Sequence, residues 1–133
     1  MTPAVCGALA LAALGVGFGL AQWLYTRRLL ARPERPTALF CISDVLALGT
    51  IEAARALGLR VPEDLSVVGF DDVEYAVMGH PRLTTVRQPC YELGRTAGEL
   101  LLTQIQGGPR GRAVYLPHTL IERDSTARCA VGS

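Results

Sequence analysis

The chain has 133 residues, of which half are hydrophobic, and its 13 basic and 12 acidic residues give a formal net charge of +1. This length and apolar content are sufficient for one domain with a core, and they exclude a disordered chain. The balanced charge gives no sign of a nucleic-acid-binding surface, on which Lys and Arg normally cluster.

The first segment is uncharged from Ala4 to Tyr25, and Arg27 and Arg28 follow it. It is long enough for a membrane span or signal anchor, and this alternative stays open. Against it, four glycines dilute the segment, and no basic region precedes it as in a signal peptide. We therefore expect residues 1–19 to be an unassigned apolar part of a domain whose true beginning is lost. A helix is predicted from Leu20 to Arg32.

A strand, helix and strand unit is predicted from residue 38 to residue 72. Residues 38–42 and 65–70 are apolar runs, typical of strands that are covered on both faces of a parallel sheet. A helix from about Val45 to Leu57 lies between them, because Ser43 and Asp44 can accept the hydrogen bonds of its first N–H groups. Such a unit is a right-handed crossover and predicts the α/β fold class.

Carboxylates follow both of these predicted strands. Asp44 follows the first strand, and Asp71 and Asp72 follow the second. In parallel sheets, ligands bind outside the carboxyl ends of the strands. We therefore expect an acidic rim at this edge of the sheet.

The central helix has a second apolar flank of mostly small residues. It consists of Ala47, Ile51 and Ala54. Small side chains allow another helix to approach closely, so this flank is a candidate contact surface. Burial within the same domain is the alternative.

The second half of the chain continues the alternation of strand and helix. A β-branched strand is predicted at residues 83–86, and an amphipathic helix from Cys90 to Gln106. Residues 113–123 form a last extended stretch that Pro117 interrupts, which suggests an edge strand or a bend. We expect the chain from Ser125 onward to be loose.

No catalytic or metal-binding pattern occurs in the sequence. The cysteines and histidines lack the spacing of metal or redox sites, and no nucleophile elbow, phosphate-binding loop or dinucleotide fingerprint is present. The residues concerned are Cys6, Cys41, Cys90, Cys129, His80 and His118. We predict free thiols, no metal, no cofactor and no enzymatic activity, so the chain is expected to bind a molecule and not to transform it.

Four motifs taken together carry a resemblance to a known family. They are PTALFCISDVLALGTIEAARALGLRVPEDLSVVGFDD, LTTVRQP, ELGRTAGELLL and LPHTLIERDST. In order and spacing they closely resemble the C-terminal part of the lactose-repressor/galactose-repressor family of transcriptional regulators. The resemblance covers residues 20–127 and leaves 128–133 as a loose tail. It implies a type I periplasmic-binding-protein-like fold, with the C-terminal lobe and partial elements of the first lobe.

The resemblance also implies site residues. Asp71 matches the family's acceptor for ligand hydroxyl or N–H groups, and Gln88 matches a position whose side chain can reach the effector. Ser43 stands where the family commonly has Asn. Asp44 is either a ligand contact or a helix cap. The family's dimer contact maps to Ala47, Ile51, Ala54 and Met78.

The function that the resemblance implies is sensing of a small-molecule effector, a sugar or sugar derivative, by a cytoplasmic homodimer. In the family a helix-turn-helix binds DNA, and this chain lacks one, so it is expected to be a truncated form that does not bind an operator specifically by itself. A periplasmic sugar-binding protein of a transporter and a non-functional remnant are the alternatives.

Overall fold

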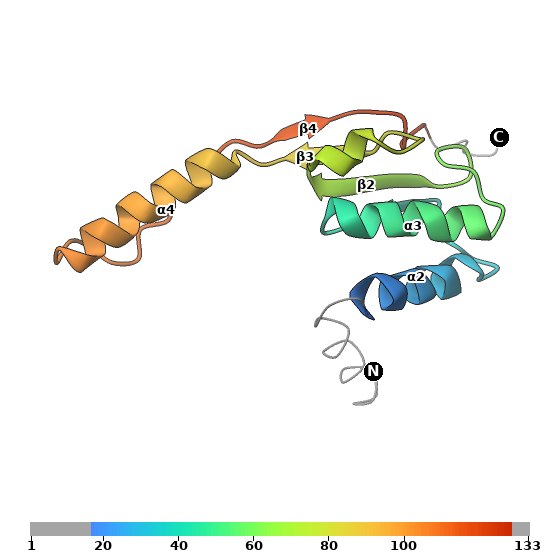
Figure 1. Ribbon diagram of the computed structural model, residues 1–133, viewed down its shortest axis with the longest axis horizontal. Coiled ribbons are helices and arrows are strands. Elements are labelled where there is room, and N and C mark those ends of the chain that lie inside the picture. The colour runs from blue at the N-terminus through green and yellow to red at the C-terminus, as the bar shows by residue number, and fades with distance from the viewer. Residues whose placement is uncertain (1–16, 129–133) are drawn as a thin grey trace.

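The computed structural model describes residues 17–128, which are built on a four-stranded sheet of order β1-β2-β3-β4 (Figure 1). The strands are β1 (Ala38–Phe40), β2 (Ser66–Asp71), β3 (Thr84–Arg87) and β4 (Thr119–Ile121). The first three are parallel, and β4 pairs with β3 in the antiparallel sense at one edge. The predicted α/β class is confirmed, and the interrupted last stretch does provide an edge strand.

Three α-helices and one short 3-10 helix accompany the sheet. They are α2 (Gly17–Leu30), α3 (Asp44–Ala56), η1 (Glu74–Val77) and α4 (Cys90–Ile105). In Figure 1, α3 lies along the sheet and α2 lies on the far side of α3, so that this part of the chain has three layers. The core forms between the sheet and α3 and includes the buried side chains of Leu46, Leu65, Val67 and Leu83.

The small-residue flank of α3 is not a surface. Ala47 and Ala54 are fully buried and Ile51 is 5% exposed, since α2 and η1 both pack against α3 and this flank belongs to the core. The prediction that these three residues form a dimer contact is therefore wrong, and burial within the domain is what occurs. Met78, the fourth predicted contact, remains 70% exposed.

Part of the N-terminal apolar segment lies outside the described residues, and so do Cys6 and Cys129. The part from residue 17 onward begins α2, whose last turn carries Arg27 and Arg28. Within residues 17–128, none of the helices has the length and apolar character needed to cross a bilayer.

Helix α4 extends away from the sheet (Figure 1). The amphipathic pattern forms a helix as predicted, but none of its residues is buried. The sheet face opposite α3 is also only partly covered, because Phe40 on that face is 62% exposed. Two apolar surfaces are thus left open by the described part of the chain.

The chain after β4 is firmly bound at Ser125, so the prediction that it is loose from that residue is wrong. Ser125 is fully buried, and its hydroxyl donates to the carbonyl of Val67 at 2.6 Å and accepts from the N–H of Thr84 at 2.8 Å. The backbone carbonyl of Ser125 accepts a further hydrogen bond from Val67. This segment therefore continues the sheet at the amino ends of β2 and β3.

Candidate functional site

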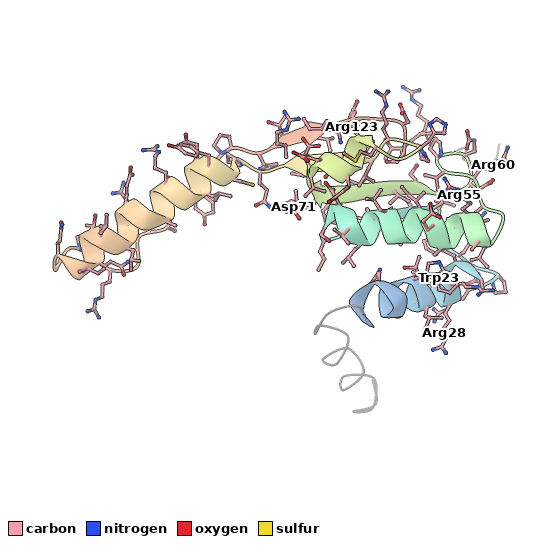
Figure 2. The ribbon with its side chains drawn as sticks, in the orientation of Figure 1. Trp23, Arg28, Arg55, Arg60, Asp71 and Arg123 are labelled. Atoms are coloured by element: carbon pink, nitrogen blue, oxygen red, sulfur yellow. The ribbon has the colours of Figure 1, made fainter. Side chains whose placement is uncertain are left out.

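The carboxyl ends of β2 and β3 bring two predicted ligand residues together. Asp71 is the last residue of β2, and its register partner is Arg87, the last residue of β3 and the neighbour of Gln88. The Nε2 of Gln88 donates to Oδ1 of Asp71 at 2.6 Å. Figure 2 shows Asp71 at the end of the sheet from which α4 departs.

The chemistry of this pair suits a hydroxylated ligand. Both side chains are half-buried, and the second oxygen of Asp71 makes no hydrogen bond with the described residues. A carboxylate accepts hydrogen bonds from hydroxyl or N–H groups, and an amide both donates and accepts. The pair therefore offers acceptors and a donor at a single edge of the sheet.

Ser43 and Asp44 begin α3 at the same edge, with different roles. The hydroxyl of Ser43 accepts from the N–H of Leu46 at 3.4 Å, so Ser43 is the helix cap and Asp44 is not. Asp44 is fully buried; its Oδ2 accepts from the N–H of Val73 at 2.8 Å and its Oδ1 from the hydroxyl of Thr85. Both carboxylate oxygens of Asp44 are thus used to join α3 to β3 and to the segment after β2.

Asp72 forms an ion-pair cluster that the sequence did not reveal. Its side chain is 6% exposed, and its carboxylate accepts from Nε of Arg87 at 2.6 Å and from Nη2 of Arg123 at 2.5 Å. Asp72 has a φ of 56°, in the left-handed region. Arg123 is 51 residues away in the chain, so no local pattern could have predicted the cluster.

An open hollow of about 440 Å³ lies beside Gln88. Its walls include Phe40 and Phe70, whose rings meet edge to face at 6.3 Å, and also Leu93 and His118. Strand alternation places Phe40 and Phe70 on the sheet face opposite α3. The hollow is therefore mainly the open apolar face of the sheet, and the polar groups lie at its edge.

The Asp72 cluster should make folding stability depend on acid pH. Burial alone would raise the pKa of Asp72, but hydrogen bonds and charges from Arg123 and Arg87 lower it overall. A carboxylate with a lowered pKa in the folded state stabilises the protein above its unfolded pKa and loses this contribution as the pH falls below about 4. The free energy of unfolding should therefore fall between pH 5 and pH 2, as measured by urea denaturation.

The Asp72→Asn variant separates this contribution from that of other acids. Asp64, whose pKa is lowered to about 2 by hydrogen bonds from Arg60, stays in both proteins. The variant should be less stable at pH 7 and should lose less stability on acidification than the native chain. Equal acid sensitivity of the two proteins would contradict the assignment.

Comparison with known proteins agrees with this geometry. The family model described as periplasmic binding protein-like domain matches residues 7–126. The transcriptional repressor CytR of Escherichia coli is 53% identical over 101 residues, which are 75% of this chain and 30% of the repressor. The chain thus spans less than a third of the length of this relative.

Solved structures give the same result. A LacI family transcriptional regulator from Bifidobacterium animalis subsp. lactis superposes with a TM-score of 0.76 at 38% identity, over 84% of this chain and 41% of the regulator. The lac repressor dimer bound to operator and the anti-inducer ONPF superposes with a TM-score of 0.75 at 35% identity, over 83% of this chain and 38% of the repressor. The family-model match, residues 7–126, includes the sheet and the Asp71 edge. The chain therefore belongs to the periplasmic binding protein-like domain family, in the form found in LacI-type transcriptional regulators.

Proposed function

We propose that this chain binds a sugar or sugar derivative at the carboxyl edge of β2 and β3, as the effector-sensing part of a transcriptional regulator. The observation that carries the proposal is the Asp71 and Gln88 pair, in which a carboxylate at the end of β2 lies 2.6 Å from the side-chain amide of the residue after β3. Adjacent sugar hydroxyls can satisfy both oxygens of a carboxylate at once. The relatives support a regulator over a transport protein, because they are transcriptional repressors.

A thermal-shift panel of monosaccharides, disaccharides and nucleosides tests this proposal. A ligand at 100 times its Kd stabilises the folded state by about 2.7 kcal/mol, which corresponds to a rise in Tm of several degrees in a domain of this size. We expect at least one member of the panel to raise the Tm with a saturating dose dependence. A flat response across the panel would contradict the proposal.

We also propose that the regulator acts as a homodimer in the cytoplasm. DNA binding is assigned to the regions of the relatives that lie outside the matched residues. The solved lac repressor is a dimer on its operator. On this chain, the exposed or half-exposed apolar side chains of α3 and η1 offer a contact surface. We call it the α3–η1 patch; it consists of Val45, Leu48, Tyr75 and Met78.

The Met78→Glu substitution tests the α3–η1 patch. Because Met78 is 70% exposed, the substitution should leave the fold intact, but a carboxylate buried in a dimer interface should weaken association by at least about tenfold. Sedimentation equilibrium measures this change. The matched control is Ile105→Glu, since Ile105 is equally exposed, at 71%, but lies at the end of α4. A native chain that stays monomeric at high concentration, or equal effects of the two substitutions, would contradict the assignment.

A further inference from the structure

The Asp72 cluster and the candidate site share a closed ring of contacts, which consists of Asp71, Asp72, Arg87 and Gln88. Asp72 directly follows Asp71, the last residue of β2, and Gln88 directly follows Arg87, the last residue of β3. The carboxylate of Asp72 binds Nε of Arg87 at 2.6 Å, and the carboxylate of Asp71 binds Nε2 of Gln88 at 2.6 Å. The last residue of β2 and the residue after it are therefore tied to the residue after β3 and to the last residue of β3.

The backbone at this ring needs such support. Asp71 has a φ of 112° and Asp72 a φ of 56°, values that residues with a side chain rarely adopt. Backbone conformations of this kind persist only where surrounding contacts hold them, and they gather at ligand sites. The contacts on Asp71 alone are few, because only Gln88 binds its carboxylate among the described residues.

Arg123 fixes the Asp72 side of the ring. Its side chain is 12% exposed, and it donates from Nη2 to Asp72 at 2.5 Å and from Nη1 to the carbonyl of Leu83 at 2.8 Å. The N–H of Arg123 also binds the hydroxyl of Thr84 at 2.9 Å. Because Arg123 is anchored at the start of β3, it holds Asp72 in place from the segment that follows β4.

We propose that Asp72 is a positioning residue for the effector site, which holds the end of β2 so that the carboxylate of Asp71 faces Gln88. The inference rests on the proposed function, because it assigns Asp72 a role through Asp71 and Gln88 and no direct contact with the ligand. Neutralising Asp72 removes one anchor of the turn, so the Asp71 and Gln88 hydrogen bond should loosen even where the fold survives.

The first test needs no ligand. In the ¹H–¹⁵N spectrum of the full chain, the side-chain amide of Gln88 is assigned from its loss in Gln88→Glu. We expect Asp72→Asn to move this resonance toward its position in Asp71→Asn. The matched control is Asp124→Asn. Asp124 also forms an ion pair, here with both of its oxygens bound to the single arginine Arg82, and it makes no hydrogen bond with the ring.

The second test uses the sugar with the largest thermal shift in the panel. Its Kd should rise about tenfold in Asp72→Asn and stay unchanged in Asp124→Asn. Where Asp72→Asn does not fold, Arg87→Ala replaces it, since the Arg87 side chain is 58% exposed and its loss leaves Arg123 in place; the same shift of the Gln88 amide is expected, with smaller size. An unmoved Gln88 amide in a folded variant overturns the positioning role. Failure of the native chain to bind any sugar overturns the proposed function and leaves the first test valid.

Discussion

Replacing Gly69 by alanine is expected to lower the free energy of unfolding by about 1–3 kcal/mol, the range found when well-packed cores are overfilled. Gly69 lies in the middle of β2, and a Cβ atom there would collide with Oδ1 of Asp44 and approach Cδ2 of Leu83 to 2.9 Å. Asp44 cannot move aside at low cost, because its carboxylate binds both Val73 and Thr85 and its Cα would be only 3.2 Å away. Chemical denaturation followed by circular dichroism measures the loss.

A control and a double variant test the cause. In Gly49→Ala the new Cβ meets nothing within 4 Å, and alanine in a helix interior should stabilise α3 by about 0.5–1 kcal/mol. Asp44→Ala alone leaves the buried Thr85 hydroxyl and the half-buried N–H of Val73 without this acceptor, and a buried donor left unsatisfied costs about 1–3 kcal/mol. Asp44→Ala also removes Oδ1, the atom with which the new Cβ of Gly69→Ala would collide. The double variant should therefore lose less free energy of unfolding than the sum of the two single variants. Additive costs would show that the close approach of Asp44 is not the cause.

The crossover unit could be predicted from the sequence because its signals are local. Two apolar runs and a serine cap define β1, α3 and β2 to within about two residues of their observed limits. Asp71 and Gln88 were named as site residues by the resemblance to the family, and their contact agrees with the rule that adjacent parallel strands end at one edge of a sheet. Such features depend on neighbours in the chain or on a general rule of sheet topology.

The contacts that were missed depend on residues distant in sequence. The small side chains of the α3 flank that contains Ala47 correctly predicted a contact with another helix. The sequence pattern could not show that this flank is covered by α2 and η1 of the same chain. Asp72 and Arg123 are separated by 51 residues. Ser125 lies beside Val67 only because the chain returns to the sheet after β4. Each case requires the three-dimensional path of the chain.

Replacing Asp71 by alanine is expected to weaken binding of the panel's best sugar by about 10- to 150-fold, which corresponds to the roughly 1.5–3 kcal/mol of a hydrogen bond to a charged group. The reason is that the ligand hydroxyls that donate hydrogen bonds to this carboxylate would lose their acceptor. Isothermal titration calorimetry of the native and variant chains measures the change. Asp71→Asn is the stricter variant, since asparagine keeps the shape and tolerates a positive φ but lacks the charge.

Asp64→Ala is the control for Asp71→Ala, because it also removes a carboxylate next to β2 but at a distance from the proposed ligand site. Asp64 lies just before β2 and pairs with Arg60, and Figure 2 shows Arg60 at the opposite end of the sheet from Asp71. Its removal breaks an exposed ion pair, which contributes little to stability, and should leave the affinity for the sugar unchanged. Gln88→Ala should weaken binding in the same direction as Asp71→Ala, and the double variant should lose less than the sum, because the two side chains act as a pair. An affinity in Asp71→Ala equal to that in Asp64→Ala would show that the ligand binds elsewhere.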